Sequence, residues 1–526
     1  MFNQELWEEW VKLESSNYEF QGGRKKYLKK GYTHFDHRIW FPSQKKDVER
    51  LIKAGLRVYN PLTKKEQWRS FTPFIKMLIK TPRYRYQEQI DDFDLECKIR
   101  PICYASHLDS LIFGYYAFAL SKLYESYIQS KGLQQVVLAY RPGTGKSNIQ
   151  HAKDAFDLVK EMNKKYNGCT VIALDIKGYF DHIDHAVLKD TWSRVIGRKL
   201  PNDQFKIFEV LTQYSYVRKE SLYRKYDVNE KKLKKKGEFP KTLFDFVPGA
   251  TIVEKYLRLK KDRLIVKKEP SPKSPIPVGI PQGSPMSSLL SNIYLVDYDE
   301  EMVELARKKG FHYRRYCDDI LLICPTSMAN EIKNYAISQI SSSRWKLTIQ
   351  AAKAEVIDFV KTEKGKFRSF RRKKNEPDTP IKPTSSNFAR LAKKSQYLGF
   401  EFDGETIFIR ASSLSRYFRK MKARLDKTVA MAYSPKGQDG KIRKTQIIER
   451  YTHLGQRNFL SYAKKAASKR YKSSETGEWK DGLDSPAILK QISRHIQILE
   501  RSLQMKNNQR YSLKLKGGKI FKKKKI

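Results

Sequence analysis

The sequence has little cysteine, and its cysteines form no pattern. Only 5 occur among 526 residues, and no two stand in a CxxC pair. Disulfide scaffolds and structural zinc sites both depend on several suitably spaced cysteines, so neither is indicated. We expect free thiols in a reducing compartment.

Long apolar runs are also lacking. No segment reaches the length of about 18 apolar residues that a membrane helix needs. The most apolar stretch, near Leu108 to Leu120, is interrupted by Asp109, Ser110 and Gly114. The opening MFNQELWEEWVKLESS is amphipathic and acidic, without the basic start and apolar centre of a secretory signal. The sequence therefore predicts a cytoplasmic protein without membrane association.

Acidic residues are scarce relative to basic ones. The chain has 57 Asp and Glu against 105 Lys and Arg, a formal net charge of +48 at pH 7. Such an excess repels itself unless a polyanion neutralises it. Lys and Arg that contact phosphates release condensed counterions, which drives binding to nucleic acid of any sequence. Nucleic acid is therefore the expected partner.

The chain is long enough for several lobes, and changes in its pattern indicate their boundaries. We expect an N-terminal extension over 1–90 that packs on a mixed α and β core over 91–410. A basic insertion is expected within the core at about 218–275. Apolar residues then recur at helical spacing in three segments, which predicts three helices over 411–505. A basic tail follows over 506–526.

Two segments place carboxylates where strands are expected to end. Asp175 closes the strand-like TVIALD, and Asp318 and Asp319 lie at the turn of HYRRYCDDILLIC. A sheet that sets this hairpin beside the first strand would bring three carboxylates together, and a divalent cation would relieve their repulsion. Two Mg²⁺ ions, with Mn²⁺ as a substitute, would suit nucleotidyl transfer. Taken singly, an Asp pair on a loop is usually only solvated.

The order of these segments gives them weight, because over roughly 95–410 the sequence resembles the reverse transcriptase family. The resemblance rests on YCDD, on DIKGYFDHID and on GIPQGSPMSSLLSNIYLVDYDEEM. It implies an α+β fold, a right-hand polymerase whose fingers and palm, with an RRM-like antiparallel sheet, precede an α-helical thumb. It also implies an RNA-directed DNA polymerase, a nucleotidyltransferase. The catalytic residues would be Asp175, Asp318 and Asp319, and the metal site would comprise Asp175, Ile176, Asp318 and Asp319.

The same resemblance implies residues that bind nucleotide and nucleic acid. Phe180 stands where an aromatic wall excludes the 2′-hydroxyl, which predicts selection of deoxynucleotides. A core phenylalanine and a solvated lysine are the plain alternatives for Phe180 and Lys353. The implied nucleotide-binding residues are Lys98, Arg100, Phe180, Gln282 and Lys353. The implied template and primer contacts are Arg141, Gly283, Tyr397, Leu398 and Gly399.

Two further segments narrow the resemblance. PFIKMLIKTPRYRY and GQRNFLSYAKKAA resemble bacterial defence-associated reverse transcriptases of the unknown-group and abortive-infection lineages, which are related to retron and group II intron enzymes. This implies a role in antiphage defence, dNTP substrates, a structured noncoding RNA as partner and, as in some relatives, a protein primer. Several alternatives stay open: a retron-type or group II intron-type reverse transcriptase, an RNA-dependent RNA polymerase, and a catalytically silent RNA-binding scaffold. The template, the priming residue, the trigger and a homo-oligomeric state are not fixed by the sequence.

Overall fold

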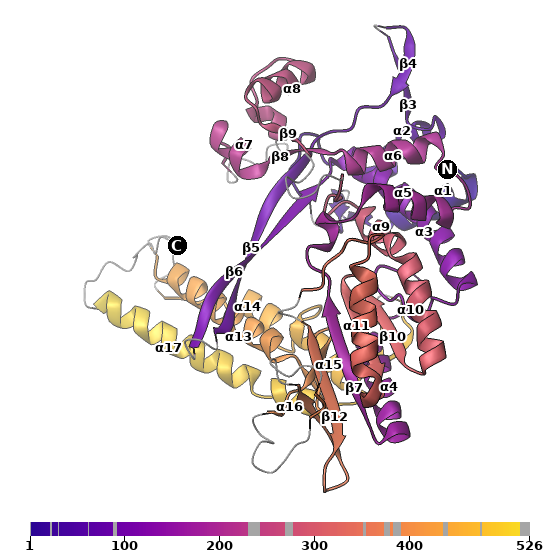
Figure 1. Ribbon diagram of the computed structural model, residues 1–526. Coiled ribbons are helices and arrows are strands. Elements are labelled where there is room, and N and C mark those ends of the chain that lie inside the picture. The colour runs from indigo at the N-terminus through magenta and orange to yellow at the C-terminus, as the bar shows by residue number, and fades with distance from the viewer. Residues whose placement is uncertain are drawn as a thin grey trace.

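A computed structural model shows a helical and sheet-rich molecule in which fingers, palm and thumb are distinct (Figure 1). The predicted Lys353, the proline-rich 269–276 and the end of the basic tail, 516–526, lie outside the described residues. The structure describes residues 2–21, 24–29, 31–61, 63–87, 92–141, 143–229, 242–268, 277–350, 354–372, 379–381, 391–434, 440–473 and 476–515.

A five-stranded antiparallel sheet in the order β10-β11-β7-β12-β13 forms the palm. Its strands are β7 (Gly168–Asp175), β10 (His312–Tyr316), β11 (Asp319–Cys324), β12 (Glu355–Lys361) and β13 (Phe367–Arg371). Successive side chains of a strand point to opposite faces, and both faces of β7 are buried: Ile172 joins one core and Val171 another. Burial on both sides explains why β7 reads as a continuous β-branched run rather than an alternating one. The predicted antiparallel palm is confirmed.

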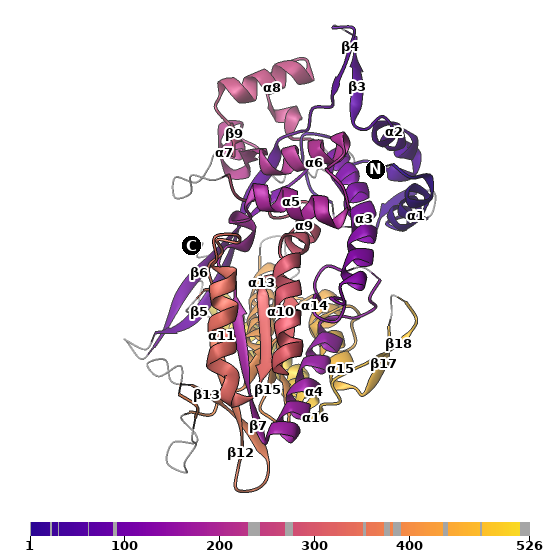
Figure 2. The same cartoon turned by 45° about the vertical axis from the view of Figure 1, so that its right-hand side comes forward.

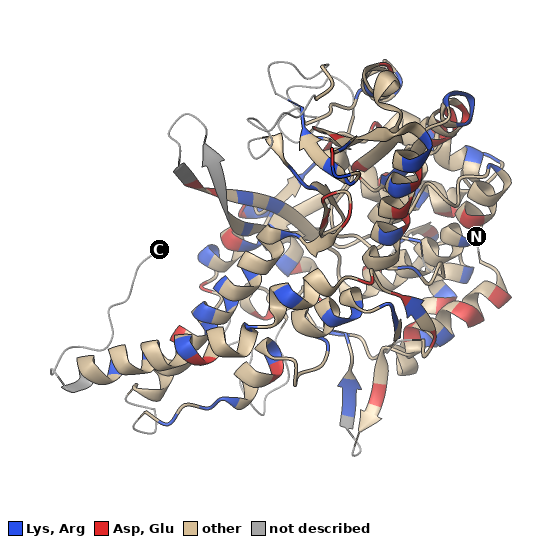
Figure 3. Ribbon diagram, turned by 90° about the horizontal axis from the view of Figure 1, so that it is seen from below, with Lys and Arg blue, Asp and Glu red and all other residues tan. Residues whose placement is uncertain are grey.

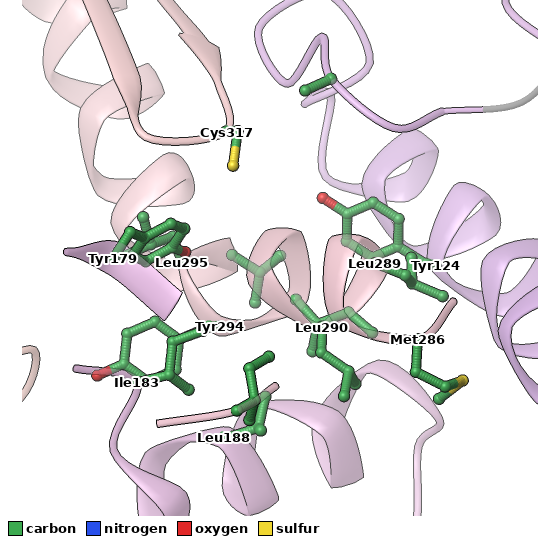
Figure 4. Close-up of a cluster of buried hydrophobic side chains, with 14 of the residues drawn as sticks. Tyr124, Tyr179, Ile183, Leu188, Met286, Leu289, Leu290, Tyr294, Leu295 and Cys317 are labelled. Atoms are coloured by element: carbon green, nitrogen blue, oxygen red, sulfur yellow. The ribbon is translucent and has the colours of Figure 1, made fainter. Parts of the chain in front are cut away.

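Helices cover both faces of this sheet. The core that contains Ile172 is built with α3, α5, α9, α10 and α11, and Figure 2 shows α10 and α11 in front of the strands. Figure 4 shows Tyr294 beside Ile183, and Leu290 near Leu188. The other core contains α4 and the thumb. The helices are α3 (His107–Ser130), α4 (Asn148–Tyr166), α5 (His185–Val195), α9 (Ser287–Tyr294), α10 (Val296–Lys309) and α11 (Ala329–Ile340), with the 3₁₀ turn η4 (Thr326–Met328) before α11.

The fingers contain a four-stranded sheet in the order β6-β5-β8-β9. Its long ribbon of β5 and β6 crosses the molecule in Figure 1, and the expected boundary at residue 90 falls inside this hairpin. The residues expected as an insertion contribute β9 to the same sheet, because β9 pairs with β8, which in turn pairs with β5. The elements are β5 (Phe74–Gln87), β6 (Asp92–Tyr104), η1 (Tyr179–Asp181), α6 (Asn202–Thr212), β8 (Ser215–Arg218), α7 (Lys219–Lys225), η3 (Leu243–Phe246), α8 (Ile252–Lys261) and β9 (Ile265–Lys267).

The N-terminal segment packs on α3 through aromatic side chains. Trp7 and Trp10 are buried, and their rings lie 5.6 and 5.7 Å from the ring of Tyr115. Two hairpins and two helices make up this segment. They are α1 (Gln4–Ser15), β1 (Tyr18–Gln21), β2 (Arg24–Tyr27), α2 (Phe41–Lys53), β3 (Arg57–Asn60) and β4 (Lys65–Trp68).

The thumb is mainly helical, but the prediction of three helices is wrong. The apolar periodicity did not indicate the short helix over Phe459–Ala467. The apolar stripe from Leu489 to Leu503 belongs to two helices, which are separated near Ser493. The last helix also runs to Leu515, past the expected start of the tail at 506. The elements are β14 (Ser395–Tyr397), β15 (Phe400–Phe402), β16 (Ile407–Ile409), α13 (Ala411–Ala432), α14 (Thr445–Tyr451), α15 (Phe459–Ala467), β17 (Arg470–Lys472), β18 (Trp479–Asp481), α16 (Pro486–Ile492) and α17 (His495–Leu515).

Basic side chains are distributed over all of these lobes, as Figure 3 shows. No helix in the described part of the chain is long and apolar enough to cross a membrane.

Candidate active site

The carboxylates singled out in the sequence meet at one edge of the palm sheet. Asp319 at the start of β11 pairs with Asp175 at the end of β7. Residues directly opposite in antiparallel strands point to the same face, with Cβ atoms about 5 Å apart. The backbone N–H of Ile176 donates to the Asp318 carbonyl at 3.0 Å, which fixes the hairpin turn against the end of β7. Strand register thus brings the backbones of Asp175, Asp318 and Asp319 to the same edge of the sheet.

The turn that presents Asp318 is tight and strained. Tyr316 pairs with Asp319, so that only Cys317 and Asp318 connect β10 and β11. Cys317 adopts a φ of +59°, a conformation that non-glycine residues seldom take and that is found at functional turns. Its side chain is buried near Ser291, and burial raises the pKa of the Cys317 thiol to about 12. The thiol therefore stays protonated and is no nucleophile.

A buried ion pair stabilises the backbone of this turn. Arg315 and Asp299 are both 0% exposed, and the guanidinium donates to the two carboxylate oxygens at 2.7 and 2.5 Å. Burial opposes the charge, but the adjoining Asp299 holds the pKa of Arg315 well above its usual value. A further N–H of Arg315 donates to the Cys317 carbonyl at 3.2 Å. The turn is therefore tied to α10 through a charged group.

The carboxylates would supply only part of a metal ion's ligand shell. The described residues contain no group of three His, Cys, Asp or Glu side chains that could hold a metal by themselves. Mg²⁺ at phosphoryl-transfer sites commonly takes one or two carboxylates and completes its shell with substrate phosphates and water. Asp175, Asp318 and Asp319 fit that mode of binding. The Ile176 side chain is apolar and 1% exposed, so only its carbonyl could contribute.

The glycine-rich loop over 279–283 connects the palm edge to the fingers. The N–H of Ile280 donates to the Phe180 carbonyl at 2.9 Å, and the Gln282 carbonyl accepts from the N–H of Cys103 at 2.8 Å. Gln282 and Phe180 are both half-buried. The loop therefore holds η1, which carries Phe180, against β6. Main-chain hydrogen bonds thus join three segments that are far apart in the sequence: η1, β6 and this loop.

The two predicted cations of the fingers lie on this same strand. Lys98 pairs with Thr81 and Arg100 with Ile79, so both are on one face of the ribbon. Both side chains are half-buried. The ribbon thus presents two positive charges along one face.

The sequence reasoning missed two further lysines. Lys76 pairs with Cys103 across the ribbon, and its ammonium lies 4.4 Å from the centroid of the Tyr216 ring. Burial raises the pKa of the Cys103 thiol to about 11, against the charges of Lys76 and Lys268. Both lysines therefore lie near the place where the loop over 279–283 contacts β6. No sequence pattern distinguishes these two lysines from the many others. Lys268 belongs to a basic run that was interpreted as a surface insertion.

Gly283 allows the close approach of the loop to β6. A Cβ at this position would lie 2.8 Å from the Cys103 carbonyl oxygen, and its φ is +117°. We expect Gly283→Ala to lower the free energy of unfolding by about 2–4 kcal/mol, through backbone strain and a clash with main chain. Urea denaturation measures the change.

Gly143 provides the matched control for this prediction. Its φ is +90°, but a Cβ there would meet nothing within 4 Å. Gly143→Ala should therefore cost only the strain, about 1 kcal/mol. Equal losses in the two variants would show that the contact with β6 is unimportant.

The expected primer hairpin lies close to the catalytic turn. Tyr397 pairs with Phe400, and Leu398 and Gly399 between them both have positive φ, 44° and 94°. A two-residue turn with this geometry suits the twist of a hairpin. Burial and the nearby Asp319 carboxylate raise the pKa of Tyr397. Tyr397 therefore lies within electrostatic reach of the catalytic hairpin.

Arg141 is placed differently from the expectation that it contacts the template. Its guanidinium donates to Glu125 at 2.7 and 2.9 Å and to the Val137 carbonyl at 2.8 Å. The side chain is 7% exposed. A template contact would have to break these bonds, so in this structure Arg141 stabilises its own loop.

A carboxylate-bearing edge of an antiparallel palm sheet, between a fingers sheet and a helical thumb, defines a right-hand polymerase. Residues 234–402 match the family described as reverse transcriptase (RNA-dependent DNA polymerase). The chain therefore contains a reverse transcriptase domain, the domain of RNA-directed DNA polymerases. The matched region includes the catalytic hairpin and the glycine-rich loop, whereas Asp175 and Phe180 precede it.

No curated protein matches the chain. Among solved structures it is similar to telomerase from Candida albicans in complex with the TWJ fragment of telomeric RNA, with 12% identity, coverage of 89% of this chain and 59% of that one, and a TM-score of 0.35. Apo telomerase from Candida tropicalis gives 10% identity, 90% and 64% coverage, and a TM-score of 0.37. The RNA-dependent RNA polymerase of a human picobirnavirus shows 10% identity, coverage of 57% of this chain and 43% of that one, and a TM-score of 0.29. The chain thus spans less than two thirds of these proteins.

Proposed function

We propose that the chain is an RNA-directed DNA polymerase that extends a primer by nucleotidyl transfer. The observation that carries this proposal is the register that sets Asp175 opposite Asp319 at the tip of the YCDD hairpin. The primer 3′-hydroxyl attacks the α-phosphorus of a dNTP, and the bond to pyrophosphate breaks. Asp175 and Asp318 would hold divalent ions, whose charge offsets that of the phosphates.

The other residues of the site would bind and select the nucleotide. Lys98 and Arg100 lie on one face of the ribbon and suit the triphosphate charge. Gln282 is held against β6 by its main-chain bond to Cys103 and would contact the nascent base pair. Phe180, half-buried on η1, presents a ring where a 2′-hydroxyl would need space. Together these residues favour a deoxynucleoside triphosphate as the substrate.

Phe180→Ala tests the sugar selection. Removal of the ring opens space for a 2′-hydroxyl, so we expect the preference for dNTP over NTP to fall by about 10- to 100-fold. Incorporation of dTTP and UTP opposite adenine, on one primed RNA template, gives the ratio. Tyr179 is 2% exposed in the core, so Tyr179→Phe is a control that keeps the neighbouring ring and should keep the ratio.

The decisive test of the polymerase itself is extension of a DNA primer on an RNA template by the purified chain. Addition of dNTPs in the presence of Mg²⁺ or Mn²⁺ supports the proposal. Exclusive use of NTPs would favour an RNA-dependent RNA polymerase, and no synthesis with retained RNA binding would favour a scaffold.

We further propose that the enzyme acts in bacterial antiphage defence with a companion noncoding RNA. The support is the resemblance carried by PFIKMLIKTPRYRY and GQRNFLSYAKKAA, together with the net charge of +48, which suits lasting association with structured RNA. Sequencing of the RNA and DNA that purify with the protein tests this role. One discrete noncoding RNA with complementary DNA is expected, whereas intron or retron RNA would favour those relatives.

Protein priming is part of the same proposal, and the chain offers 31 tyrosines as hydroxyl donors. Product DNA would then stay attached to the protein after denaturation and be released by proteinase. Product that is fully released by denaturation alone contradicts it.

A further inference from the structure

The β17–β18 hairpin of the thumb presents an exposed tryptophan among basic residues. Trp479 is 62% exposed and pairs with Lys472, while Arg470 pairs with Asp481 two residues away, so all four share one face. The Arg470 guanidinium lies 6.0 Å from the Trp479 ring centroid. Its exposed ion pair with Asp481, at 3.7 Å, contributes little to stability. Nothing in the packing of the thumb explains an indole in this position.

The opposite face of this hairpin is anchored to the palm. The side-chain amide of Gln150 on α4 donates to the Tyr471 hydroxyl at 3.3 Å and to the Asp481 carbonyl. The amide oxygen of Gln150 accepts from the N–H of Ser147 at 2.9 Å. The exposed face with Trp479 is therefore held in a fixed position relative to the start of α4. Figure 2 shows this hairpin beside α4 and α15.

A cavity of about 610 Å³ begins at the same place and reaches the catalytic hairpin. Ser147, bonded to Gln150, forms part of its wall. Tyr316 of the YCDD turn also lines the cavity, and its hydroxyl donates to Asn148 at 3.1 Å, while Tyr462 contributes from the thumb. The lining residues are Leu138, Tyr140, Arg141, Thr144, Lys146, Ser147, Asn148, His151, Tyr316 and Tyr462.

We propose that the exposed face of the β17–β18 hairpin, whose other face is anchored beside this cavity, binds a single-stranded segment of nucleic acid. The inference deepens the proposed function and rests on it. Aromatic side chains stack on unpaired bases while nearby cations hold the backbone, a combination typical of single-strand binding. Bases within a duplex are already stacked and leave no face open to an indole. Trp479, Lys472 and Arg470 therefore fit a single strand.

Trp479→Ala in the full chain tests this surface. We expect its Kd for a fluorescent oligo(dT) or oligo(rU) single strand to rise by about 5- to 150-fold, the loss of one stacked base. Trp479→Phe keeps a ring and should restore most of the affinity, which separates stacking from a folding defect. Tyr59→Ala is the matched control, because Tyr59 is 63% exposed on the distant β3–β4 hairpin and should leave Kd unchanged.

Two outcomes overturn the proposal. Equal affinities of Trp479→Ala, Tyr59→Ala and the parent chain would show that the hairpin takes no part in binding. An equal loss for single strands and blunt duplex would show a general charge effect. Primer extension by the parent chain is measured in parallel: DNA synthesis with unchanged single-strand binding in Trp479→Ala refutes the surface alone, and lost binding without any synthesis refutes the polymerase alone.

Discussion

Asp318→Asn is expected to reduce primer extension on an RNA template by on the order of 10³-fold or more. Asn keeps the shape of Asp but removes the negative charge that would hold a divalent ion beside the substrate phosphates. The turn itself should persist, because the bond from Ile176 is accepted by the Asp318 main-chain carbonyl rather than by its side chain. The loss should therefore lie in chemistry and not in folding.

Single-turnover incorporation of one dNTP measures this effect, and the Kd for primed template should stay within about threefold of the parent value. Asp190→Asn is the matched control: Asp190 is 68% exposed on α5 and pairs with Arg194 at 3.3 Å. It should leave extension unchanged. If Asp318→Asn retained a large part of the activity, the assignment of the YCDD hairpin as the catalytic centre would be wrong.

The palm could be predicted from sequence because each of its signals is local. Strands are predicted by the β-branched run that ends at Asp175 and by the hairpin pattern around Asp318. Each pattern places a carboxylate at a strand end. The right-hand fold, which is confirmed, was implied by the resemblance of these segments to the reverse transcriptase family. The pairing of Asp175 with Asp319 depends on register, which appears only when the strands are assembled.

The thumb and the fingers were less predictable for physical reasons. Helices as short as α15 over Phe459–Ala467 give too few turns for a periodic signal. The β17–β18 hairpin consists of three-residue strands whose charged residues read as loop. The residues expected as an insertion join the fingers sheet through β9, which pairs with β8 about 50 residues earlier in the sequence, and no local pattern reveals this pairing.

Arg315 shows most clearly that the burial of a residue can depend on a partner that local sequence does not reveal. In HYRRYC it stands between Arg314 and Tyr316, and a charged side chain would be expected at the surface. It is instead 0% exposed, which is possible only because Asp299 approaches from α10 and Tyr313 donates to the same carboxylate at 2.6 Å. A residue's burial here depends on a partner 16 positions earlier in the sequence. The hydrogen-bond network that supports the YCDD turn therefore could not be predicted from the sequence.

Asp299→Ala should consequently have the largest effect on stability. It leaves the buried guanidinium of Arg315 without a counter-charge and removes the acceptor of the Tyr313 hydroxyl, so we expect the free energy of unfolding to fall by about 3–5 kcal/mol. Urea denaturation of the full chain measures the change in the free energy of unfolding. Glu304→Ala, on the same helix, removes one partner of an ion pair with Lys308 in which both side chains are 68% exposed. That change should have no measurable effect.

A double variant separates the charge from the packing. If the cost of Asp299→Ala arises from an uncompensated buried charge, removal of both charges in Asp299→Leu with Arg315→Met should recover most of the lost stability, because a buried pair replaced by apolar residues is often neutral. Failure to recover would mean that the hydrogen bonds from Arg315 to Cys317 and Asn292 are what hold the palm together. In either case the double variant loses the bond to the Cys317 carbonyl. We therefore expect slower primer extension even where stability returns, because the strained turn that presents Asp318 has lost its support.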